Sequence, residues 1–271
     1  MPNGDRHERL EALRPREVEH GRIGAVRSLR PVCHDAVIDL YERHAHDFDR
    51  DRRAAPFREQ VWLDRFLGEV AAGGAVLDVG CGTAEPIARY IIARGFHVTG
   101  VDASNSMIAL CRARLPDHEW VVSDMRVLAL ASRFDGIIAW DSFFHLTMDE
   151  QRAMFARFAA HAAPGAALMF TSGPRAGEAI GSYRGEPLYH ASLDPAEYQQ
   201  LLASHGFTLR TWQPEDPECG GHTVWLAFKS SSPRTVTRQS PRRPPSSRRR
   251  RTGARSASRR NGRARHPGSD R

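Results

Sequence analysis

A short apolar run that leads into two closely spaced glycines constrains this chain more than any other feature. Residues 75–79 (AVLDV) have the continuous apolar character of a buried strand, and Gly80 and Gly82 follow at once. Glycine permits the dihedral angles of a tight turn and lets a ligand approach the main chain closely. Residues 85–94 then have the pattern of a helix, whose first turn offers unpaired N–H groups. The segment predicts a strand, a glycine turn and a helix at the ligand-binding edge of a sheet.

Strand and helix patterns alternate along the rest of residues 33–230. The expected strands are at 96–101, 119–123, 134–140 and 166–171, with a closing antiparallel pair at 207–212 and 222–228. The expected helices are at 32–48, 56–71, 104–115, 147–162 and 194–206. Repeated strand–helix–strand order predicts an α/β fold, with a Rossmann-like, doubly wound, mostly parallel sheet, an antiparallel C-terminal edge pair and helices on both faces.

The net charge is distributed unevenly along the chain. The formal net charge is +7, yet residues 231–271 contain 14 arginines and one acid and carry +13, whereas residues 1–230 carry −6. We therefore expect a poorly ordered extension at 1–32, a folded domain at 33–230, and a disordered Arg/Ser/Pro-rich tail at 231–271. The tail lacks aromatic residues that could stack on bases. We interpret it as a solvated or non-native C-terminus, so a nucleic-acid partner is disfavoured.

Several classes of protein are disfavoured by what the sequence lacks. No apolar run approaches the roughly 18 residues of a membrane span, and the charged N-terminus lacks the apolar centre of a signal peptide. The four cysteines (Cys33, Cys81, Cys111 and Cys219) are too scattered for a disulfide framework or a zinc site. We expect a cytoplasmic protein that uses no metal and contacts no membrane.

Two kinds of nucleoside ligand compete for the glycine turn. Asp102 lies twenty residues after Gly82, where a carboxylate can accept hydrogen bonds from both ribose hydroxyls. A dinucleotide fingerprint would need its third glycine at position 85, but Glu85 stands there and would repel a pyrophosphate. Asp78, just before the first glycine, suits a cationic ligand instead. These residues favour a positively charged nucleoside over NAD.

Together these motifs resemble those of the class I S-adenosylmethionine-dependent methyltransferases. Residues 76–85, 101–107, 123–125 and 134–146 resemble the family's first motif, its ribose and adenine segments and its fourth-strand motif, in the right order. The resemblance implies S-adenosylmethionine as cofactor. It implies that the methionine moiety is lined by Asp78, Gly80, Cys81 and Gly82.

The same resemblance assigns the rest of the cofactor site. Asp102 would hold the ribose, with Ala103 and Met107 packed nearby. The Asp124 carboxylate would accept from the adenine amino group, and the Met125 backbone would face the ring edge. Trp140 is either a wall of the site or part of the core. One departure from the family pattern is Ala84, which stands where a third glycine is common and whose methyl group could crowd the cofactor carboxylate.

Candidate catalytic residues follow the fourth strand. Asp141 and His145 lie where an acceptor would be bound, and they could orient or deprotonate it. Alternatively, His145 only caps the helix that begins near Thr147. Residues 172–193 are long and rich in glycine and aromatic residues, and they could cover the pocket. Further aromatic candidates for such a cover are Tyr41, Trp62, Tyr183, Tyr189 and His190.

The function expected from these motifs is methyl transfer from S-adenosylmethionine to a small-molecule acceptor. One alternative is an RNA or protein methyltransferase that uses the basic tail. Another is a non-catalytic nucleotide-binding module of the same fold. The motifs specify the cofactor far better than the acceptor, and they indicate neither the methylated atom nor the oligomeric state.

Overall fold

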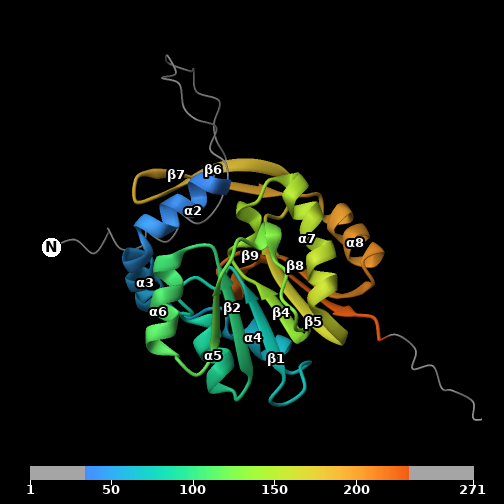
Figure 1. Cartoon of the computed structure of the whole chain (residues 1–271). Helices are drawn as coiled ribbons and strands as arrows, with labels where there is room; N and C mark the ends of the chain where they lie inside the picture. The colour runs from blue at the N-terminus through green and yellow to red at the C-terminus, as the bar shows by residue number, and fades with distance from the viewer. Residues whose placement is uncertain (1–33, 232–271) are drawn as a thin grey trace, which may run out of the picture. The chain divides into compact units, whose positions relative to one another are not determined.

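A seven-stranded sheet forms the centre of the chain in the computed structural model, which describes residues 34–231 (Figure 1). The predictions for residues 1–32 and for the tail beyond residue 231 lie outside the described residues. The strand order is β3-β2-β1-β4-β5-β9-β8. The five parallel strands are β1 (Ala75–Val79), β2 (His97–Asp102), β3 (Glu119–Val122), β4 (Phe134–Ala139) and β5 (Ala162–Ser172).

The sheet closes with an antiparallel pair, as predicted. β9 (His222–Lys229) pairs with β5, and β8 (Phe207–Asp216) forms the edge beyond it. The order reverses between β1 and β4, because the chain first builds outward to β3 and then returns to the other side of β1. In a doubly wound sheet this reversal opens a crevice at the carboxyl ends of the strands. The glycine turn after β1 lies at that point.

Helices cover both faces of the sheet (Figure 1). One face packs against α4 (Gln60–Leu67), α5 (Ile87–Ala93) and α6 (Asn105–Arg114), in a core that includes Trp62, Ile91 and Val76. The other face packs against α7 (Met148–His161) and α8 (Pro195–Ser204), through Phe155 and Tyr198. Strands buried on both faces explain why β1 and β4 are almost continuously apolar in sequence.

The predicted helix starts at the C-terminal side are confirmed. Thr147 caps α7 in a capping box, since its hydroxyl accepts from the Glu150 N–H while the Glu150 carboxylate accepts from the Thr147 N–H. Asp194 caps α8 through the N–H of Ala196, with proline at the first helical position. Both helices therefore begin where their sequence signals place them.

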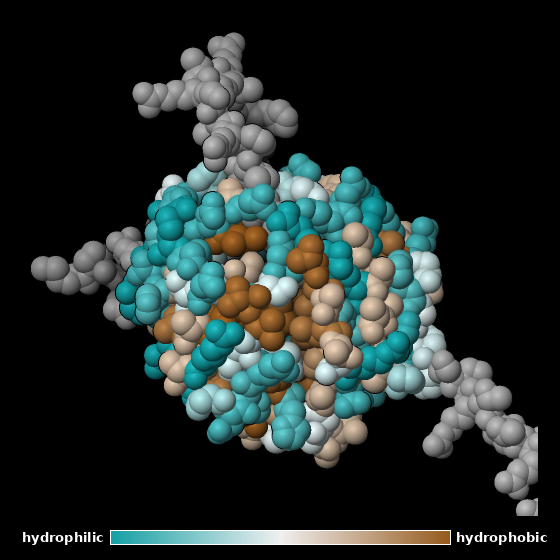
Figure 2. All heavy atoms as spheres, viewed as in Figure 1, coloured by the Kyte–Doolittle hydropathy of each residue, from teal (hydrophilic) through white to brown (hydrophobic). Residues whose placement is uncertain are grey.

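Residues 172–193 contain two strands that the sequence analysis did not predict. β6 (Gly177–Tyr183) and β7 (Glu186–Ser192) form a separate hairpin. Its buried side chains Tyr183 and Leu188 share a small core with Val37 and Leu40 of α2 (His34–Arg43). Figure 1 shows α2 and the hairpin side by side above the sheet, and α3 (Ala45–Ala54) follows α2. Figure 2, which shows the molecule from the same side as Figure 1, shows apolar residues gathered at the centre of this view.

Candidate functional site

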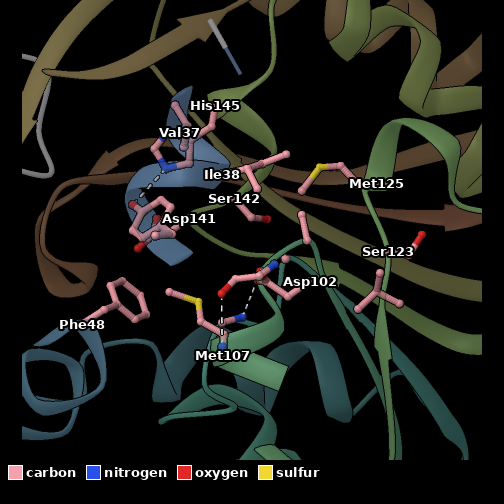
Figure 3. A pocket seen from close by; sticks show the side chains of 16 residues that line it. Val37, Ile38, Phe48, Asp102, Met107, Ser123, Met125, Asp141, Ser142 and His145 are labelled. Carbon is pink, nitrogen blue, oxygen red and sulfur yellow. Dashed lines mark hydrogen bonds between the residues drawn. The ribbon is translucent and has the colours of Figure 1, made fainter. Parts of the chain in front are cut away.

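A pocket lies at the carboxyl ends of the central strands, at the crossover between β1 and β4. It contains about 620 Å³ of empty space, part of which is open solvent. Figure 3 shows Asp102 and Met107 on one side of it and Val37, Ile38 and His145 on the opposite side. The pocket is lined by Val37, Ile38, Tyr41, Phe48, Gly80, Gly82, Val101, Asp102, Ala103, Ser104, Met107, Ser123, Met125, Asp141, Ser142 and His145.

The glycine turn forms one wall and uses the conformational freedom of its glycines. Gly80 has φ +75° and Gly82 has φ +54°, in the left-handed region that side chains disfavour. A Cβ at Gly80 would lie 2.3 Å from the Cβ of Ser142, which follows β4. The Gly80 N–H also donates to the Val101 carbonyl at 2.7 Å, so a hydrogen bond joins the turn to β2. The turn is therefore narrow and fixed, with no room for a side chain.

Ala84 adopts φ +66°, where glycine would be unstrained. Its methyl group is buried, and Ala84 does not line the pocket. The structure therefore gives no support to the expected crowding of a cofactor carboxylate, and the departure from the family pattern adds local strain instead.

Asp102 lines the pocket with its carboxylate held by the main chain. The N–H of Gly82 donates to one oxygen and the N–H of Ser104 to the other, each at 2.9 Å. A carboxylate has about four lone-pair sites, so Asp102 keeps acceptor capacity for a ligand beside these main-chain donors. Burial raises the pKa of Asp102, and the backbone donors partly oppose this. Ala103 and Met107 also line the pocket, so this predicted group lies together.

Asp78 is buried at the end of β1 and has no hydrogen-bond donor within residues 34–231. It is 3% exposed. Burial, and secondly the negative charge of Asp102, raises the pKa of Asp78 to about 7. A buried carboxylate without a partner is costly when it is ionised. A cationic ligand group nearby would lower that cost, but Asp78 is not among the residues that line the pocket, so its contact with the methionine moiety stays a prediction.

The end of β3 meets the prediction in part. Ser123 and Met125 line the pocket, but Asp124 does not. The Asp124 carboxylate accepts from Arg126, at 2.8 Å from Nε and 2.6 Å from Nη2. It also caps a short 3₁₀ turn at Met125–Val127 through the Arg126 N–H. A contact between Asp124 and an adenine amino group therefore stays a prediction.

Cys81 and Trp140 lie in the core beside the site, and neither lines the pocket. The Cys81 sulfur packs over Gly100 of β2, where an added Cβ would lie 2.9 Å from it, and burial raises the pKa of its thiol. The Trp140 ring lies 5.4 Å from that of His222. The structure thus gives no support to cofactor contacts by these two side chains.

His145 faces the pocket from the 3₁₀ turn Phe143–His145, and its orientation is fixed. Its Nδ1 lies 2.8 Å from the Tyr189 carbonyl of β7, and its Nε2 lies 3.2 Å from the Tyr41 hydroxyl of α2. A carbonyl only accepts, so Nδ1 carries the proton, and in the neutral ring Nε2 accepts from Tyr41. The alternative that His145 caps α7 is wrong, because Thr147 caps that helix.

Asp141 is held by a partner that the sequence analysis missed. His222 of β9 places Nε2 3.0 Å from the Asp141 carboxylate, and its Nδ1 lies 2.6 Å from the Cys219 carbonyl. Burial opposes charge on both groups, but the ion pair raises the pKa of His222 to about 11 and lowers that of Asp141. Asp141 also has φ +49°, a strained backbone position at the pocket wall. No local sequence signal joins residues 81 positions apart.

Of the aromatic candidates for a cover, one lines the pocket and the others lie in the core or pack nearby. Tyr41 lines the pocket, whereas Trp62 lies in the core and donates to Asp216 at 2.7 Å. Tyr183 and Tyr189 pack against α2, and the His190 ring lies 4.8 Å from that of His145. Within residues 34–231 no group of His, Cys, Asp and Glu could hold a metal ion. No helix in this part of the chain is long and apolar enough to cross a membrane.

Comparisons with known proteins agree with this geometry. A family model described as a methyltransferase domain matches residues 76–165. A trans-aconitate 2-methyltransferase of Azoarcus is 31% identical over 185 residues, which are 61% of this chain and 67% of the relative. A Geobacillus protein named as a methyltransferase is 35% identical over 126 residues, 43% of this chain and 51% of its own length. The chain thus spans between half and two thirds of these relatives.

Solved structures share the fold. A Burkholderia thailandensis 1,6-didemethyltoxoflavin N1-methyltransferase, with acceptor and S-adenosylhomocysteine bound, matches with a TM-score of 0.59 at 21% identity, over 80% of this chain and 99% of that one. An amino pentose methyltransferase of Micromonospora echinaspora with bound S-adenosylmethionine matches with a TM-score of 0.55 at 21% identity, over 68% and 96%.

Proposed function

Because the chain belongs to the class I S-adenosylmethionine-dependent methyltransferases, we propose that it transfers the methyl group of this cofactor to a small molecule. One observation carries the proposal. A single pocket joins the wall formed by Gly80, Gly82 and Asp102 to a second wall formed by Tyr41 and His145. Cofactor and acceptor can therefore meet in one pocket.

The first wall fits S-adenosylmethionine by its shape and charge. The turn at Gly80 and Gly82 leaves the main chain open to the methionine moiety. Asp102 lines the pocket and presents a fixed carboxylate to a ribose diol. Asp78 is buried at the end of β1 and does not line the pocket, so its negative charge would favour the cationic cofactor without a contact that the geometry supports.

The second wall supplies what the reaction needs from the protein. The bound cofactor supplies a methyl group already activated on a sulfonium. The chain must align the acceptor and exclude water, and good alignment can contribute on the order of 7–11 kcal/mol. His145, whose Nε2 accepts from the Tyr41 hydroxyl at the pocket wall, would serve as general base, a role that typically contributes about 10²–10⁴-fold. Asp141, fixed by His222, would orient the acceptor from the end of β4.

A small acceptor is favoured over RNA or a protein. α2 and α3 contribute Val37, Ile38, Tyr41 and Phe48 to the pocket, so its acceptor side is narrow and mostly apolar. No lysine or arginine belongs to the lining residues, whereas a nucleic-acid groove is strongly basic. The relatives named for trans-aconitate and 1,6-didemethyltoxoflavin also act on small molecules. A cytoplasmic location stays a prediction from the sequence.

The test is transfer of a radiolabelled methyl group from S-adenosylmethionine into fractions of a cell extract separated by size. We expect label in the fraction below about 1 kDa with the wild-type protein and with Asp117→Ala, an exposed control. We expect none with Asp102→Ala. Label only in RNA or protein would overturn the small-molecule assignment. Unchanged activity after removal of residues 232–271 would exclude a methyltransferase that depends on the basic tail.

A further inference from the structure

The acceptor side of the pocket is apolar and lacks a free positive charge among the described residues. Val37, Ile38 and Phe48 form its walls, and Phe48 packs edge-on against Tyr41 with ring centres 5.4 Å apart. The charged lining residues are the acids Asp102 and Asp141. An apolar, ring-shaped molecule fits such walls, and an anion does not.

Within residues 34–231, Arg52 and His222 are cations whose charges act on this side, and both are paired with carboxylates. Arg52, whose charge acts on both Tyr41 and Asp141, donates to Glu59 at 2.7 Å, and both side chains are largely buried. His222 is paired with Asp141 at 3.0 Å. A carboxylate or phosphate on the acceptor would need a cation of its own, because burial of an unpaired anion is costly.

Tyr41 and His145 form a chain of hydrogen-bond donors on this side of the pocket. The Tyr41 hydroxyl donates to His145 Nε2 at 3.2 Å, and His145 Nδ1–H donates to the Tyr189 carbonyl at 2.8 Å. The Tyr41 oxygen therefore keeps lone pairs that can accept a hydrogen bond from a ligand hydroxyl. Tyr41 contributes this oxygen from α2, whose inner face packs on the β6–β7 hairpin.

We propose that the acceptor is an uncharged phenol with an apolar ring system, and that its proton leaves through the Tyr41 hydroxyl to His145. This inference rests on the proposed function and names the substrate class of the same site. A phenol has an ordinary pKa of about 10, and burial raises the pKa of Tyr41 above that of a free tyrosine, so the phenol can give its proton to the Tyr41 oxygen as Tyr41 gives its own proton to His145. An aliphatic alcohol, with an acidity near that of water, would make the same transfer strongly uphill.

The step balances in atoms and charge. A lone pair of the phenol oxygen forms the new O–CH₃ bond, and the electron pair of the broken S–CH₃ bond stays on sulfur, leaving S-adenosylhomocysteine. The phenol proton moves to the Tyr41 oxygen as the Tyr41 proton moves to His145 Nε2. The positive charge thus passes from sulfonium to imidazolium, which the Tyr189 carbonyl and the nearby charge of Asp141 stabilise.

The test compares 2-naphthol with 2-naphthoate, which share a ring system and differ in the acceptor group. Binding is measured by calorimetry on the full chain saturated with S-adenosylhomocysteine. We expect 2-naphthol to bind at least tenfold more tightly. A preference for 2-naphthoate, equal binding, or no naphthol binding to the saturated protein would overturn this inference. Failure of S-adenosylhomocysteine itself to bind would instead overturn the proposed function.

Two variants test the charge argument and one tests the proton path. Ile38→Arg places a cation at the pocket and should reverse the preference toward 2-naphthoate, whereas Ile180→Arg, at an exposed position of β6, should leave it unchanged. Tyr41→Phe should lower kcat for 2-naphthol methylation at least tenfold, with the Kd for S-adenosylhomocysteine within twofold of wild type. An unchanged kcat would refute the proton path, and unreversed selectivity in Ile38→Arg would refute the charge argument.

Discussion

Replacement of Gly80 by alanine should destabilise the protein by about 1–5 kcal/mol. The new Cβ would lie 2.3 Å from the Cβ of Ser142 and 2.8 Å from its Oγ, which donates to the Val79 carbonyl. The left-handed conformation of Gly80 costs an alanine about 1–2 kcal/mol, and overpacking adds about 1–3 kcal/mol. The smaller conformational entropy of the unfolded alanine chain offsets about 0.4–1 kcal/mol.

Gly95 provides a matched control for the backbone term. It has φ +85°, but a Cβ there would meet nothing within 4 Å. Gly95→Ala should therefore cost only about 1 kcal/mol. The measurement is urea unfolding followed by circular dichroism, with the free energy of unfolding extrapolated to water. Gly80→Ala should also abolish S-adenosylhomocysteine binding, and Gly95→Ala should not. Equal destabilisation by the two substitutions would refute the close packing that we infer at Gly80.

The remaining predictions concern titration and capping. The pKa of Asp78, raised to about 7, gives the folded protein stability that is present below the unfolded pKa of Asp78 and is lost as the pH rises toward 7. Asp78→Asn should therefore become more stable relative to wild type between pH 4 and pH 8, by up to roughly 4 kcal/mol in urea unfolding. A stability difference that stays constant over this range would contradict the prediction. The pKa of His222, raised to about 11, gives stability that is present below pH 6.5 and is lost as the pH rises toward 11. Wild type should therefore lose stability over that range relative to His222→Gln. Curves of unfolding free energy against pH that run parallel for the two proteins would exclude the ion pair with Asp141. Thr147→Ala should cost about 1 kcal/mol in the same assay through loss of the capping box with Glu150, and no change would mean that the cap is not formed in solution.

The parallel strands could be predicted because each carries its own local signal. An apolar run such as residues 75–79, followed by glycines and then by a helical pattern, identifies a strand, a turn and a crossover helix without any distant contact. The hairpin at 177–192 could not be predicted in this way. Its strands are buried by packing against Val37 and Leu40 of α2, which are far away in sequence, so no local pattern indicates the hairpin.

The same distinction divides the site. Asp102 is found in the sequence because its position follows from the end of the second strand and from the distance to Gly82. The contacts of the acceptor side are not found, because they join residues that are far apart. Tyr41 and His145 are separated by 104 residues, and Asp141 and His222 by 81. Asp124 shows the converse, since its position is predicted but its engagement by Arg126 depends on side-chain geometry.

Titration with S-adenosylhomocysteine tests the central claim most directly. Calorimetry on the wild-type chain should show one site per chain, and Asp102→Ala should bind at least tenfold more weakly because it lacks the carboxylate that we propose to bind the ribose. Asp117→Ala, which removes an exposed acid away from the pocket, should bind like wild type. Absence of detectable binding by the wild-type chain, or equal binding by the Asp102→Ala variant, would contradict the cofactor site described here.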